Sequence, residues 1–176
     1  MDDARSARIH LALRVMWMVG FAVGTTTHVI DLTLGGIDVY EDAPTAVRAF
    51  WVALTALDPT VIVLMLGGAP TREGLAALRW RRAAVLLGAA IMVADVAVNA
   101  TMTFEIGMPG AAPGQIGVGL VTQTAFAVFV LATAPLLWRR RAPDSARSSP
   151  DPADTARFSA EPAAPAVDAA DPPPSS

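Results

Sequence analysis

The chain has 176 residues, of which 53% are hydrophobic, and its formal net charge at neutral pH is −3. It contains no cysteine, which excludes disulfides, thiolate metal sites and thiol redox chemistry. So apolar a composition in a short chain predicts an integral membrane protein, and the lack of basic patches interleaved with aromatic residues argues against nucleic-acid binding. Arginine without lysine, together with abundant alanine and proline, favours a bacterial source.

Four apolar segments are long enough to cross a bilayer, which takes about 20 residues of helix. These segments are 12–35, 48–68, 83–106 and 116–138. We therefore predict an all-α fold, an integral membrane four-helix bundle within residues 1–141. The first segment is longer than the apolar core of a signal peptide and three more follow it, so we interpret it as an uncleaved span.

Arginine placement predicts the orientation of these spans. The two chain ends and the loop between the second and third spans carry clusters of arginine, whereas the loops 36–47 and 107–115 carry none. Cytoplasmic loops are enriched in basic residues, so both termini should be cytoplasmic. We predict a multi-pass protein of a bacterial plasma membrane, in contact with the lipid bilayer.

The tryptophans fit this orientation. Trp51 lies at the outer end of the second span, and Trp80 and Trp138 lie at inner ends, where interfacial tryptophan is expected. Trp17 lies deeper in the first span, and we expect it to pack within the bundle.

The segment 142–176 consists mainly of Pro, Ala, Ser and Asp. Such a composition cannot bury enough apolar surface to offset the entropy of an ordered chain. We predict a disordered cytoplasmic tail, which either docks a partner or has no specific role.

Each span carries polar side chains that are costly in hydrocarbon. They are His28 and Asp31 in the first span, Asp58 in the second, Asp95 and Asn99 in the third, and Gln123 in the fourth. Counted at about 1.5 Å of rise per residue, all six lie between the outer interface and the bilayer midplane. Spacings of three and four residues place the pairs in the first and third spans on common helix faces. We predict that the six form a polar layer facing the bundle interior, as a candidate ligand-binding site.

Two backbone features accompany this layer. Gly20 and Gly24 form a small-xxx-small motif, which favours close helix packing. Pro59 follows Asp58 and removes one helical hydrogen bond, which either opens a pocket beside the carboxylate or only bends the helix to pack.

No hydrolase motif, phosphate loop, dinucleotide fingerprint or metal-ligand spacing occurs, so we predict neither a cofactor nor a metal ion. The sequence does not decide whether the protein is an enzyme. Three function classes remain open: binding of a small hydrophobic or cationic ligand or lipid, a structural or accessory subunit whose polar layer specifies packing, and a proton-coupled transporter subunit. Four spans are few for a carrier, so the last class calls for a homo-oligomer.

Residues 28–58 combine several features that together resemble a known family. The first span ends with His28 and then Asp31, the outer loop is acidic and contains Tyr40, and the second span opens with "FW" and carries Asp58. In these features residues 28–58 resemble the EXPERA group of four-span membrane proteins, which includes emopamil-binding sterol isomerases and sigma-2-receptor-like proteins. The resemblance implies a hydrophobic cationic or sterol-like ligand held by acids in the outer half of the bundle.

Overall fold

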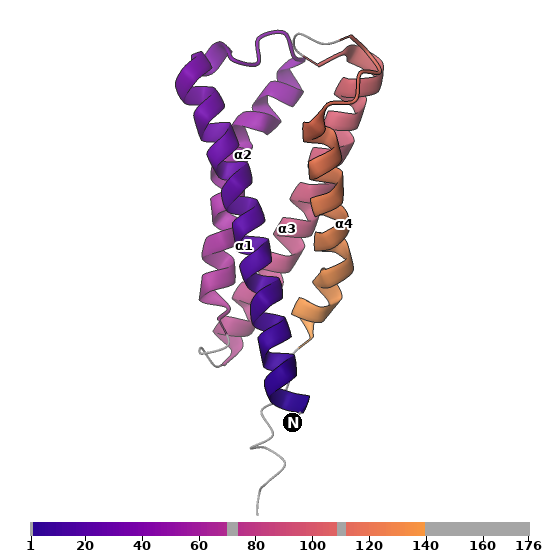
Figure 1. Ribbon diagram of the computed structural model, residues 1–176. Helices are drawn as coiled ribbons and strands as arrows, with labels where there is room; N and C mark the ends of the chain where they lie inside the picture. The colour runs from indigo at the N-terminus through magenta and orange to yellow at the C-terminus, as the bar shows by residue number, and fades with distance from the viewer. Residues whose placement is uncertain (1, 70–73, 109–111, 140–176) are drawn as a thin grey trace, which may run out of the picture. The chain divides into compact units, whose positions relative to one another are not determined.

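The computed structural model describes residues 2–69, 74–108 and 112–139, which form four long helices (Figure 1). These are α1 (Asp2–Gly35), α2 (Thr45–Gly67), α3 (Leu75–Thr101) and α4 (Val118–Trp138). A short 3-10 helix, η1 (Gly36–Asp38), follows α1, and a π-helical turn, η2 (Met102–Ile106), continues α3. The described residues contain no strand, and the all-α prediction is confirmed.

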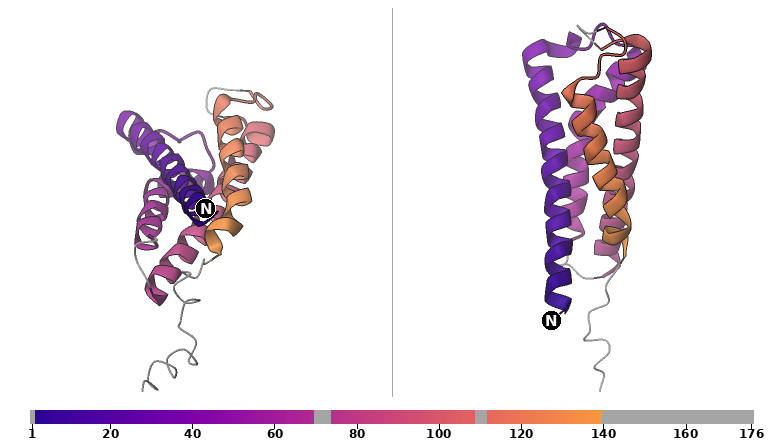
Figure 2. Two further views of the ribbon diagram at one scale, coloured as in Figure 1. Left: turned by 60° about the horizontal axis from the view of Figure 1, so that its bottom comes forward. Right: turned by 45° about the vertical axis from the view of Figure 1, so that its right-hand side comes forward.

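Neighbouring helices run in opposite directions, as Figure 1 and the turned views of Figure 2 show. Helix α2 packs against α1 and α3, α3 packs against α4, and α1 also contacts α4. The ends of α1 and η2 lie at the same end of the bundle as the starts of α2 and α4. We call this the outer end, following the orientation predicted from arginine placement, and the opposite end the inner end.

All four helices are long and apolar enough to cross a membrane, which indicates a multi-pass membrane protein. The candidate spans are Ala4–Gly35, Thr45–Gly67, Leu75–Ile106 and Val118–Trp138. The four predicted segments fall within or close to these spans.

The first and third helices begin earlier than the predicted spans, α3 at Leu75 rather than at residue 83. Helix α1 begins at Asp2 rather than at residue 12, because helical hydrogen bonding continues through polar residues that a hydropathy pattern does not count. The third span ends in a π-helical turn rather than an α-helix. Helix α2 runs through Pro59 to Gly67 without a break. The predicted tail, 142–176, lies outside the described residues.

Aromatic rings that pack onto glycines close the inner half of the bundle. Trp17 is fully buried, as expected, and its Nε1–H donates to Thr133 Oγ1 at 2.9 Å, which joins α1 to α4. A Cβ atom on Gly88 would lie 2.8 Å from Cζ3 of Trp17, and a Cβ on Gly20 would overlap the ring of Phe126. Gly20 of the small-xxx-small motif therefore makes room for the ring of Phe126 from α4 rather than for the backbone of another helix.

Arg14 and Trp51 are both buried within the bundle. Arg14 is buried, and its guanidinium donates to the backbone carbonyls of Gly68, at 2.7 Å, and Met65. It thus satisfies carbonyls that the end of α2 leaves without helical partners. Trp51 lies near the outer end of α2, as predicted, but it does not face lipid: the residue is only 4% exposed, and the ring of Tyr40 from the outer loop packs on it.

The fit of Trp17 onto Gly88 gives a direct test of this packing. Gly88→Ala should lower the free energy of unfolding by about 1–3 kcal/mol, because an overpacked core forces side chains out of their preferred rotamers. The matched change Gly119→Ala meets no atom within 4 Å and should be close to neutral. Thermal unfolding in nanodiscs measures both, and equal stability of the two variants would contradict the packing described.

Candidate functional site

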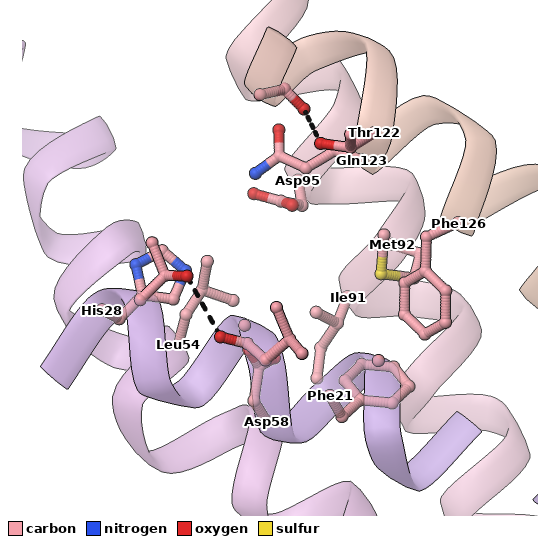
Figure 3. Close-up of a pocket in the computed structure, with 15 residues that line it drawn as sticks. Phe21, His28, Leu54, Asp58, Ile91, Met92, Asp95, Thr122, Gln123 and Phe126 are labelled. Atoms are coloured by element: carbon pink, nitrogen blue, oxygen red, sulfur yellow. Dashed lines mark hydrogen bonds between the residues drawn. The ribbon is translucent and has the colours of Figure 1, made fainter. Parts of the chain in front are cut away.

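A cavity of about 390 Å³ lies between the four helices, towards their outer ends (Figure 3). Each helix contributes one of the predicted polar residues to its wall: His28 from α1, Asp58 from α2, Asp95 from α3 and Gln123 from α4. The structure therefore brings together four of the six predicted site residues. Asp31 and Asn99 do not line the cavity.

Asp58 reaches the cavity because α1 has no side chain opposite it. Asp58 is 5% exposed, and a Cβ atom on Gly24 would lie 2.5 Å from its Oδ2. The carboxylate thus lies against the bare backbone of α1. His28 is one turn further along the same face of α1, since residues four apart are neighbours on a helix.

Asp95 is held by its own helix. Asn99 Nδ2 donates to Asp95 Oδ1 and to the backbone carbonyl of Asp95, both at 2.8 Å. The predicted pairing of these two residues is thus observed, and Asn99 lies behind Asp95 rather than on the cavity wall. Asp95 and Asp58 line the same cavity, so the two carboxylates face a shared space. Within the described part of the chain neither carboxylate forms an ion pair.

The inner wall of the cavity is apolar. Helix α1 runs outwards and α4 runs inwards, so Phe21 and Phe126 both lie on the inner side of His28 and Gln123. The two rings meet edge to face with centroids 5.5 Å apart, and Met92 lies beside them (Figure 3). A ligand in this cavity would meet both aromatic rings with a thioether and carboxylates.

Asp31 faces the outer loop, and Tyr40 is the reason. The Tyr40 hydroxyl donates to Asp31 Oδ2 at 2.9 Å and lies 3.5 Å from His28 Nδ1. Gly36, at a φ of 67°, allows the chain to turn after α1, and the Tyr40 ring packs on Trp51 with centroids 5.0 Å apart. Burial, then the hydrogen bond and the charge of Asp31, raise the pKa of Tyr40 well above its usual range.

Tyr40 was not among the predicted site residues. The signal that could have found it is its position, since the only tyrosine of the chain lies in the loop that follows the His28 and Asp31 pair. Among the described residues, no three histidine, cysteine or acidic side chains are grouped closely enough to hold a metal ion.

Comparisons of the chain with models of protein families, with curated proteins and with solved structures find no match. The resemblance to the EXPERA group stays an expectation based on residues 28–58. A four-helix fold by itself specifies no activity, so the chemistry of the cavity is what bears on function.

The single tyrosine makes the Tyr40–Asp31 contact measurable by absorbance. Because folding raises the pKa of Tyr40, this group stabilises the folded state below about pH 10, the usual tyrosine value, and loses that effect as the pH rises through the folded pKa. Tyrosinate absorbance should thus appear at higher pH in the folded than in the denatured protein. Asp31→Asn should reduce the difference in pH between the two titrations without abolishing it, because Tyr40 stays buried.

Tyr40→Phe supplies the baseline for that titration, because it leaves no phenol to ionise. Coincident titration curves for folded and denatured protein would contradict the described burial of Tyr40 and its bond to Asp31.

Proposed function

We propose that this protein binds a small hydrophobic cation in the outer half of its membrane-spanning bundle. We place it in the plasma membrane of a bacterium, with both termini in the cytoplasm and the cavity near the outer face. The observation that carries the proposal is that Asp58 and Asp95, from two different helices, line one cavity without an ion-pair partner among the described residues.

A bound cation would relieve two costs at this site. A charged side chain in the middle of a bilayer costs about 3 kcal/mol on insertion scales, and two neighbouring carboxylates also repel each other. Arg14, the buried arginine of α1, is bonded to the carbonyls at the inner end of α2. A ligand cation between the two carboxylates supplies the missing charge.

The remaining wall suits an apolar substituent. Phe21 and Phe126 offer aromatic surface, which attracts both hydrocarbon and cations, and Met92 adds an adaptable thioether. The cavity volume of about 390 Å³ falls at the small end of the range for small-molecule sites. The size and lining of the cavity suit an amine that carries one ring or a short chain.

The hydrogen bonds disfavour a purely structural role for the polar layer. If the layer specified helix packing, its members would bond across helices. The described bonds of Asp95 stay within α3, and Asp58 makes none. Side chains that do bond from one helix to another include Trp17 and Arg14, towards the inner end.

Binding of 4-phenylbutylamine and of 4-phenylbutanol, its neutral counterpart, to the protein in nanodiscs tests the proposal. The amine should bind at least about tenfold more tightly than the alcohol, and Asp58→Asn or Asp95→Asn should each remove most of this preference. Asp38→Asn is the matched control, since Asp38 is an exposed loop acid paired with Arg48.

Thermal unfolding without ligand separates lost binding from lost folding. Either substitution to asparagine should keep or raise the unfolding temperature, because it removes one of two repelling charges. Equal affinity for the amine and the alcohol in the wild-type protein would refute cation binding.

A further inference from the structure

The loop contact at Tyr40 has a chemical consequence for the cavity. The Tyr40 hydroxyl has one hydrogen, and the bond to Asp31 Oδ2 at 2.9 Å uses it. The oxygen therefore presents only lone pairs to its other neighbour, Nδ1 of His28, 3.5 Å away.

A neutral imidazole carries its single N–H on either of two nitrogens. With Nδ1 protonated, the contact to the Tyr40 oxygen is attractive, whereas an unprotonated Nδ1 would set lone pair against lone pair. The hydrogen bond on one ring nitrogen thus decides the state of the other. Tyr40 and Asp31 select the form of His28 in which Nε2 is unprotonated and accepts hydrogen bonds.

His28 lines the cavity (Figure 3), and an unprotonated Nε2 that faces it would add one acceptor to those of the wall. Asp58 and Asp95 contribute carboxylate oxygens. The hydroxyl of Thr27 donates to the carbonyl of Val23 at 3.1 Å, and that of Thr122 donates to the carbonyl of Gly119 at 2.9 Å.

Both threonine hydrogens are therefore used within their own helices, and the two oxygens can only accept. Among the described side chains that line the cavity, the amide of Gln123 alone retains N–H donors. The wall is thus rich in acceptors and poor in donors.

We propose that this cavity selects cations with several N–H donors, namely primary or secondary ammonium groups or guanidinium, over quaternary ammonium. Tyr40 and Asp31 are positioning residues that set this selectivity through His28. The inference rests on the proposed binding of a cation and adds which class of cation is bound. A site built to accept hydrogen bonds rejects an analogue without donors, because its buried acceptors are then left unpaired.

The tautomer can be measured without any ligand. In protein labelled with ¹⁵N-histidine, His28 should show a protonated Nδ1 and an unprotonated Nε2, with His10 identified by its loss in His10→Asn. Tyr40→Phe keeps the ring on Trp51 and should shift His28 towards the Nε2–H form that free histidine prefers. Asp38→Asn should leave the spectrum unchanged. A protonated Nε2 in the wild-type protein, or no response to Tyr40→Phe, would overturn the inference.

Matched cations test the selectivity itself. We expect 4-phenylbutylamine to bind at least about tenfold more tightly than its N,N,N-trimethyl derivative, and Tyr40→Phe to reduce this ratio while the quaternary ion still binds. Equal binding of both cations, with both lost in Asp58→Asn, would overturn the donor selectivity and leave cation binding intact. If neither cation binds the wild-type protein, both proposals fail.

Discussion

A carboxylate among lipid tails costs about 3 kcal/mol or more, and α2 and α3 each carry one in mid-helix, Asp58 and Asp95. This cost fixes which faces of the two helices point inwards, since both side chains are buried within the bundle. Burying these carboxylates against apolar side chains alone would cost as much as exposing them to lipid. The bundle meets the constraint with a recess at Gly24, where Asp58 approaches bare backbone, and with Asn99, which donates to Asp95.

The two halves of the bundle differ in structure: the inner half is closely packed and the outer half contains the cavity. In the inner half, rings fill the space above glycines, Trp17 bonds across to Thr133, and Arg14 completes the end of α2. These contacts join helices directly and leave no need for the polar layer to do so. The outer half is therefore free to keep a cavity, whose walls depend on an inner half that is already packed. Tyr40 then places a loop residue at the edge of that cavity.

The sequence predicted the spans because apolar length is a property of each segment alone. It also predicted that His28, Asp58, Asp95 and Gln123 share a depth, since helical rise converts residue number into distance. Which way a side chain turns depends on neighbours outside its helix, and there the prediction was incomplete. The spacing of His28 and Asp31 made them neighbours, yet it could not show that Asp31 bonds to Tyr40.

The same limit explains Trp51 and Asn99. Trp51 has the position of an interfacial residue, but the path of a loop decides whether lipid reaches it, and here the loop covers it. Asn99 shares a face with Asp95, as its spacing predicts, yet its amide is used on that carboxylate rather than on the cavity. Close approaches such as Gly24 to Asp58 arise only when two helices are placed together.

We propose that Asp58 and Asp95 together give one cavity a negative field. The chain has no native cysteine, so Asp58→Cys offers a single reactive thiol inside that field. An aminoethyl methanethiosulfonate should modify this thiol about tenfold faster than the sulfonatoethyl reagent, relative to their rates on Gln115→Cys, an exposed position of the loop before α4. Asp95→Asn should abolish the difference. Equal relative rates with Asp95 present would contradict the account.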